Sequence, residues 1–158
     1  MNHAFLIKYG EIALKGKNRR TFEESLMKQI KFALAGLDAE FVITNPTGRI
    51  FIESADDFDV EDAIDALQHV FGIVGICPAV LIEDEGFDDL AQKLVAYVDE
   101  QYPDKNFTFK VEARRARKNY PMNSMELNAA LGEKLLDAFP TLKVDVHQPE
   151  VMVHVEIR

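Results

Sequence analysis

The order of strand-like and helix-like segments in the first half of the chain constrains its fold more than any other feature. Apolar side chains recur there either in short runs, which are typical of strands, or at spacings of three and four, which are typical of helices. The predicted elements are a strand at 3–9, a helix with an apolar face over 22–37, strands at 39–44 and 49–53, a helix at 60–70 and a strand at 74–83. This β-α-β-β-α-β order predicts a ferredoxin-like fold.

Local signals place the ends of these elements. Asn18 or Thr21 can cap the first helix, and Thr21 with Glu24 fits the capping-box pattern. Gly36 can end that helix. The Pro- and Gly-containing segment 45–48 predicts a hairpin turn between the two middle strands. Pro78 inside the last strand predicts an edge strand, a bulge or a break.

The second half of the chain predicts another α/β unit, so the fold class is α+β. Its expected elements are a helix after Gly86, a strand at 107–113, a helix at 124–138 and strands at 142–146 and 151–157. We expect the boundary between residues 70 and 85. We set it at 72/73, which gives an N-terminal domain at 1–72 and a second domain at 73–158, although a family profile for the second could start near 60.

Charge is distributed very unevenly along the chain. The formal net charge is −9, yet segment 8–31 and segment 110–118 each carry +4, so the remaining residues carry −17. An acidic body with two basic segments would direct an anionic partner to those segments. The alternative interpretation is that they are solvated surface loops.

Each basic segment links a predicted strand to the start of a predicted helix. Helix amino ends bind anions through free N–H groups, and Lys and Arg side chains beside them add phosphate contacts. We expect the two segments to face the same way and to cradle one polyanion. Tyr120 or Met122 could pack on a ribose or base, and Ser124 and Asn128 could orient the loop or bind directly. The candidate phosphate contacts are Lys15, Lys17, Arg19, Arg20, Arg114, Arg115, Arg117 and Lys118.

Signs of catalytic chemistry are few. The four histidines are scattered, no Walker-type loop or nucleophile elbow occurs, and we assign no catalytic residue and no metal ligand. The acidic run at 83–85 is expected to serve solubility. The single cysteine, Cys77, excludes an internal disulfide, fits a reducing cytoplasm and is expected to be an inert buried thiol. No signal peptide and no apolar run near the ~20 residues of a membrane helix is apparent, so no membrane partner is expected.

Two stretches resemble known families of tRNA-modifying enzymes. Residues 9–19, YGEIALKGKNR, resemble the N-terminal signature of bacterial tRNA 4-thiouridine synthetases, the tRNA sulfurtransferases. A second set resembles the core of a THUMP domain, and the two likenesses together span essentially the whole chain. The second set comprises residues 109–111, Arg114, Lys118, Pro121, Ser124, Glu126, Asn128 and Gly132.

The resemblance implies a ferredoxin-like domain followed by a THUMP domain, which together bind the acceptor stem and 3′ end of tRNA. It also implies a downstream ATP-pyrophosphatase domain that adenylates the target uridine, with persulfide sulfur from a cysteine-desulfurase-type donor. A link to thiamine thiazole synthesis is implied as well, and a homodimeric parent and a further rhodanese-like domain stay open. The Ser-Gly-Gly-x-Asp-Ser nucleotide loop is missing from this sequence. We therefore expect a recognition module that lacks the catalytic domain and holds no cofactor, while its parent would use ATP.

Two alternatives remain open at this stage. The chain could belong to a THUMP-containing methyltransferase or pseudouridine synthase, against which the 9–19 motif argues. It could instead be a ferredoxin-like regulatory or protein-interaction module, because such folds serve many functions. Salt-sensitive binding of tRNA would separate the leading hypothesis from the second alternative.

Overall fold

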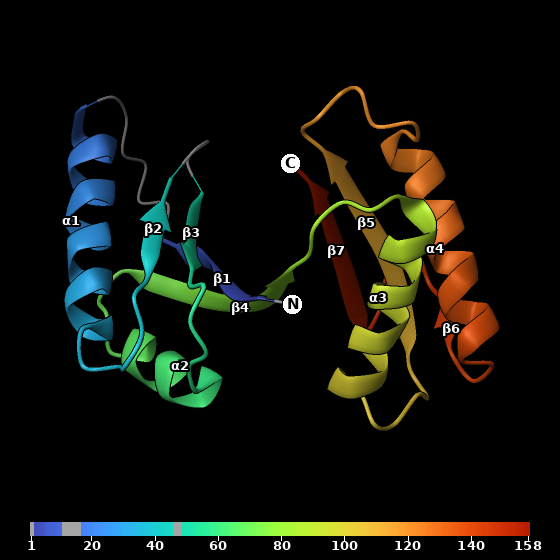
Figure 1. The fold of residues 1–158 in the computed structure, drawn as a ribbon, viewed down its shortest axis with the longest axis horizontal. Helices are drawn as coiled ribbons and strands as arrows, with labels where there is room; N and C mark the ends of the chain where they lie inside the picture. The colour runs from blue at the N-terminus through green and yellow to red at the C-terminus, as the bar shows by residue number, and fades with distance from the viewer. Residues whose placement is uncertain (1, 11–16, 46–48) are drawn as a thin grey trace. The chain divides into compact units, whose positions relative to one another are not determined.

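The computed structural model describes residues 2–10, 17–45 and 49–158, and the chain divides into two compact units, Met1–Glu83 and Asp84–Arg158 (Figure 1). The division follows strand β4 (Ile73–Leu81), which pairs antiparallel with β1 (Asn2–Tyr9). The division lies within the range 70–85 expected from the sequence and later than the boundary set at 72/73, which would separate β4 from the sheet that it completes.

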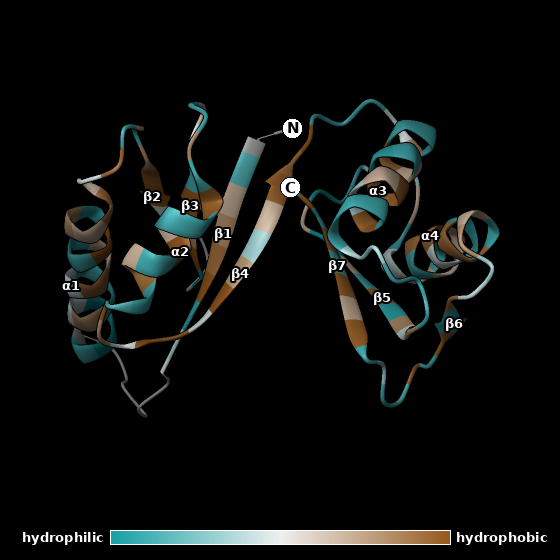
Figure 2. Ribbon diagram, turned by 90° about the horizontal axis from the view of Figure 1, so that it is seen from below, coloured by the Kyte–Doolittle hydropathy of each residue, from teal (hydrophilic) through white to brown (hydrophobic). Residues whose placement is uncertain are grey.

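The first unit is an antiparallel sheet with two helices. Its remaining elements are α1 (Lys17–Leu34), β2 (Val42–Thr44), β3 (Ile50–Glu53) and α2 (Val60–Gln68). The strand order is β2-β3-β1-β4, and both helices lie on one face of the sheet (Figure 2). This arrangement confirms the predicted ferredoxin-like fold.

The core of the first unit lies between the sheet and its helices. Alternate residues of β1 and β3 point into it, as expected for strands with one solvated face. Helix α1 contributes residues spaced by four, as its apolar pattern predicted. The largest fully buried side chains are Phe5, Leu26, Ile30, Leu34, Ile50, Ile52 and Leu67.

Some predicted details of the first unit are confirmed and others are wrong. Helix α1 begins at Lys17, so Thr21 lies inside the helix and is not its cap. The helix ends at Leu34, and Gly36 does not adopt the left-handed conformation of a glycine cap.

Pro78 does lie on an edge strand, as predicted. Cys77 on the same strand is partly exposed, not buried. Of the turn predicted at 45–48, residues 46–48 fall outside the described residues.

The second unit is a three-stranded parallel sheet covered on one face by two helices (Figures 1 and 2). Helices α3 (Phe87–Gln101) and α4 (Ser124–Ala138) and strand β5 (Thr108–Arg115) meet in a core that includes Leu94, Phe109, Leu127 and Leu131. No described helix is long and apolar enough to cross a membrane. The elements are α3 (Phe87–Gln101), β5 (Thr108–Arg115), α4 (Ser124–Ala138), β6 (Lys143–Val144) and β7 (Val151–Ile157), with strand order β6-β5-β7.

Among the described glycines of the first unit, Gly72 is the one whose backbone and surroundings most require a glycine. Its φ is +100°, and an added Cβ would lie 3.3 Å from Cζ of Phe22. We expect Gly72→Ala to lower the free energy of unfolding by about 1–3 kcal/mol, because the left-handed backbone and the contact are both strained. Gly36→Ala is the matched control, since a Cβ there meets nothing within 4 Å, and it should leave stability unchanged or raise it by up to about 1 kcal/mol. Urea denaturation of the two variants measures the difference, and equal effects would contradict this account.

Candidate nucleic-acid interface

Hydrogen bonds fix both ends of the loop that joins β5 to α4. This β5–α4 loop comprises residues 116–123. The backbone N–H groups of Ala116 and Arg117 both donate to the carbonyl oxygen of Ile157, at 2.8 and 3.3 Å, where β7 ends. The side-chain oxygen of Asn128 accepts from the backbone N–H of Ala113 at 2.7 Å, which ties α4 to β5. Asn128 therefore holds α4 against β5 just before the loop begins.

The amino end of α4 is capped by its own chain. The Asn123 side chain accepts from the backbone N–H of Glu126 at 2.8 Å. Ser124, one of the predicted RNA contacts, is the first residue of the helix and is partly buried. The loop therefore leads directly into a helix amino end, with the partial positive charge that such an end carries.

Arg115 stabilises this loop by a hydrogen bond to the loop's own backbone. Its guanidinium Nη1 donates to the carbonyl oxygen of Tyr120 at 2.9 Å, and the side chain is partly buried. The predicted phosphate contact therefore also has a structural role, because it stabilises the chain reversal between β5 and α4.

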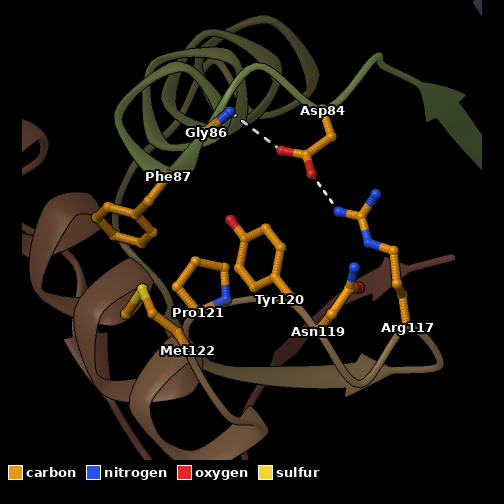
Figure 3. Close-up of a pocket in the computed structure, with 8 residues that line it drawn as sticks. All are labelled: Asp84, Gly86, Phe87, Arg117, Asn119, Tyr120, Pro121 and Met122. Carbon is orange, nitrogen blue, oxygen red and sulfur yellow. Dashed lines mark hydrogen bonds and ion pairs between the residues drawn. The ribbon is translucent and has the colours of Figure 1, made fainter.

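Arg117 is held by two groups of the same unit. Its guanidinium pairs with the carboxylate of Asp84 and lies over the ring of Tyr120, 5.7 Å from the ring centroid (Figure 3). Asp84 also accepts a hydrogen bond from the backbone N–H of Gly86 at 3.0 Å. The Gly86 N–H and then the Arg117 guanidinium hold the pKa of Asp84 below its ordinary value, so the carboxylate is charged at neutral pH.

Tyr120 belongs to the core of the second unit. Only 6% of the residue is exposed, so its ring is not available for the base stacking that the sequence suggested. Its hydroxyl points toward the start of α3 and makes no hydrogen bond with any described residue (Figure 3). Burial, and then the negative charge of Asp84, raise the pKa of that hydroxyl. Met122 is also packed against this core.

A cavity of about 420 Å³ lies between the start of α3 and the β5–α4 loop (Figure 3). Its walls combine apolar side chains with the Arg117–Asp84 pair. The residues around it are Asp84, Gly86, Phe87, Arg117, Asn119, Tyr120, Pro121 and Met122.

Arg114 and Lys118 remain the exposed cations next to this loop. Both are exposed to solvent, and Arg114 lies opposite Glu156 in the parallel register of β5 and β7. With the partly exposed Arg117, they form the solvent-facing part of the second basic segment.

The first basic segment is also partly engaged in its own unit. Arg19 Nε lies 2.8 Å from Oε1 of Glu23, and the other Glu23 oxygen accepts from the Asn45 amide. Burial raises the pKa of Glu23, but the hydrogen bonds from Arg19 and Asn45, the positive charge of Arg19 and a hydrogen bond from Tyr9 together hold it below its ordinary value. Arg20 forms an exposed pair with Glu24 at 3.2 Å.

The structure does not describe the side chains of two predicted phosphate contacts in this segment, Lys15 and Lys17. Lys15 lies outside the described residues, and Lys17 opens α1 with a side chain that the structure does not describe. The first turn of α1 contains no acidic residue, whereas those of α2, α3 and α4 each contain at least one. Cations at a helix amino end are unfavourable on their own, and a bound anion would offset this.

Sequence reasoning missed Asp84 and Ile157. Asp84 sits in the acidic run that was predicted to serve solubility, and its partner Arg117 is 33 residues away. Ile157 contributes only a backbone carbonyl, which no residue pattern signals. Within the described ranges, no group of three or more His, Cys, Asp and Glu residues is arranged to hold a metal ion.

Family comparisons agree with this two-unit architecture. Residues 4–77 match the model of the ThiI ferredoxin-like domain, and residues 85–158 match that of the THUMP domain. The chain therefore consists of a ThiI ferredoxin-like domain followed by a THUMP domain. It is 59% identical over 158 residues to a probable tRNA sulfurtransferase of Lachnospira eligens and 35% identical over 159 residues to one of Coxiella burnetii. All of this ThiI–THUMP chain is covered in both comparisons, but it spans only 40% of each relative.

Solved structures show the same likeness. The ThiI–THUMP chain is covered completely by a 4-thiouridine synthetase crystallised with RNA and bound ATP, with a TM-score of 0.79, 31% identity and 39% of that chain covered. PH1313 from Pyrococcus horikoshii Ot3 matches with a TM-score of 0.77 and 29% identity, and 51% of its chain is covered. TrmN from Thermus thermophilus, at 20% identity and a TM-score of 0.62, shares the fold.

Asn128 offers a test of how the loop is supported. Asn128→Ala leaves the Ala113 N–H without its acceptor, so we expect the free energy of unfolding to fall by about 1–3 kcal/mol. Amide exchange at Ala113 should accelerate in the same variant. Asn106→Ala removes an exposed side chain of the same type and should change stability by less than about 0.5 kcal/mol. Similar losses in both variants would contradict the support role.

The Glu23 network predicts a pH dependence. Because the pKa of folded Glu23 is lowered, its contribution to stability is present above the ordinary glutamate pKa and is lost as the pH falls through the lowered value. Glu23→Gln should therefore reduce the free energy of unfolding at pH 7 and have a smaller effect at pH 3, measured by urea denaturation. Glu24→Gln, in an exposed pair, should have a small effect at both pH values. A Glu23→Gln effect that does not change with pH would be inconsistent with the network.

Proposed function

We propose that this chain is the tRNA-recognising part of a tRNA sulfurtransferase. One observation carries the proposal: the whole chain matches part of a 4-thiouridine synthetase that was crystallised with RNA, at 31% identity. In this proposal the THUMP domain binds the acceptor end of tRNA beside the β5–α4 loop. Recognition rests on backbone phosphates and on the single-stranded 3′ end, because the bases of an RNA duplex are poorly accessible to side chains.

Charge and geometry around the loop support RNA binding. Arg114 and Lys118 are exposed, the Arg117 guanidinium is partly exposed, and the amino end of α4 follows within a few residues. These groups suit phosphate oxygens, which accept hydrogen bonds and attract cations. The net charge of −9 would repel a polyanion from most of the remaining surface.

The first unit would contribute fewer phosphate contacts than its sequence suggests. Arg20 is exposed and can exchange Glu24 for a phosphate at little cost, because exposed ion pairs are weak. Arg19 is held by Glu23 and Tyr9, so we assign it mainly to support of the start of α1. Lys15 and Lys17 remain proposed phosphate contacts.

The sulfur chemistry would belong to the rest of the protein. The chain covers about 40% of the length of the curated relatives, which are described as probable tRNA sulfurtransferases. We propose that the remaining part uses ATP and a persulfide donor to convert a uridine of the bound tRNA to 4-thiouridine. A cysteine-desulfurase-type partner, a cytoplasmic location and a link to thiamine remain predictions from the family resemblance.

Binding of tRNA at several salt concentrations tests this proposal. Arg114→Ala with Lys118→Ala should weaken binding about tenfold or more and make the log–log salt slope shallower by about two, because two phosphate contacts are lost. Lys134→Ala with Lys143→Ala removes the same charge from exposed positions elsewhere in the unit and should leave the slope nearly unchanged.

Filter binding of total tRNA at ~50 mM and ~200 mM salt gives the readout. Equal losses in the two double variants would indicate diffuse electrostatic attraction and no defined site. Binding that does not respond to salt would favour a protein-interaction module.

A further inference from the structure

Asp84 occupies an unexpected place for an acidic residue. It is the first residue of the second unit and lies beside the loop that is proposed to bind RNA. A carboxylate so close to a phosphate site should weaken binding if only net charge mattered. Its contacts indicate a different role.

The two oxygens of the Asp84 carboxylate have separate partners. Oδ1 accepts from the Gly86 N–H at 3.0 Å, just before α3 begins, and Oδ2 pairs with Nη2 of Arg117 (Figure 3). The hydrogen bond to Gly86 fixes the carboxylate relative to α3. The Asp84 carboxylate, held in this way, orients the Arg117 guanidinium.

The held guanidinium retains donors for another ligand. A guanidinium has five N–H donors, and the Asp84 contact engages Nη2. The Arg117 side chain is 38% exposed, with the Tyr120 ring beneath it and its backbone N–H bonded to Ile157. The side chain is thus oriented before a ligand arrives, which removes part of the entropy cost of binding.

We propose that Asp84 is a positioning residue for RNA binding, whose carboxylate holds the Arg117 guanidinium in the orientation that donates to an RNA phosphate. The inference rests on the proposed function and assigns Asp84 a favourable effect on affinity in spite of its charge. The opposite role, a competitor that keeps phosphate away from Arg117, makes the opposite prediction.

Two variants with the same charge change separate these roles. Asp84→Asn keeps an oxygen for Gly86 but loses the ion pair, and we expect it to weaken tRNA binding about threefold to tenfold. Glu85→Gln neutralises the neighbouring exposed carboxylate and should leave binding unchanged or strengthen it slightly. Binding by Asp84→Asn that is as tight as wild type, or tighter, would overturn the proposal.

A double-mutant cycle with Arg117→Ala tests whether Asp84 acts through that side chain. In the Arg117→Ala background, Asp84→Asn should no longer weaken binding of total tRNA at ~100 mM salt. An equal loss in both backgrounds would mean that Asp84 acts through the fold, which also overturns the proposal. If the wild-type chain bound no tRNA, the proposed function itself would be wrong. If the wild-type chain bound tRNA normally and Asp84→Asn had no effect, only this inference would be wrong.

Discussion

The backbone carbonyl of Ile157 anchors the start of the loop on which the proposed function depends. Two consecutive N–H groups, those of Ala116 and Arg117, converge on this one oxygen. Parallel pairing of β7 with β5 brings Ile157 opposite Arg115, so the acceptor lies where the loop leaves the sheet. The side-chain contacts of Arg115 and Arg117 then act on a backbone that is already fixed. The register of β5 and β7 therefore positions the backbone that carries the charged side chains of this site.

The cations of the two basic segments serve two different purposes. Arg115 and Arg19 donate hydrogen bonds to groups within their own units. Arg115 donates to a backbone carbonyl, and Arg19 donates to the partly buried carboxylate of Glu23. Arg114 and Lys118 face solvent, and Arg117 lies between these cases because it is both paired and partly exposed. The formal charge of a basic segment thus overstates the charge that a ligand can reach. An exposed cation that is already oriented loses less conformational entropy when it binds a phosphate.

Local apolar spacing was sufficient to predict most of the fold. The period of Leu127, Leu131 and Leu135 identifies the buried face of α4, and the element order identifies the ferredoxin-like unit. The capping-box pattern at Thr21 predicted the wrong start for α1, because the helix begins four residues earlier, at Lys17. The Asp84–Arg117 pair could not be predicted, since its partners are distant in sequence and Asp84 sits among other acids. Patterns within one element are visible in sequence, whereas contacts between elements depend on packing.

Amide hydrogen exchange of the chain with and without tRNA tests most directly whether the β5–α4 loop is the binding surface. The account predicts that tRNA slows exchange across residues 114–128, which comprise the end of β5, the loop and the first turn of α4. It also predicts that exchange on the exposed face of α3 (Phe87–Gln101) is unchanged. Protection confined to α3, or to neither region despite saturating tRNA, would contradict the account.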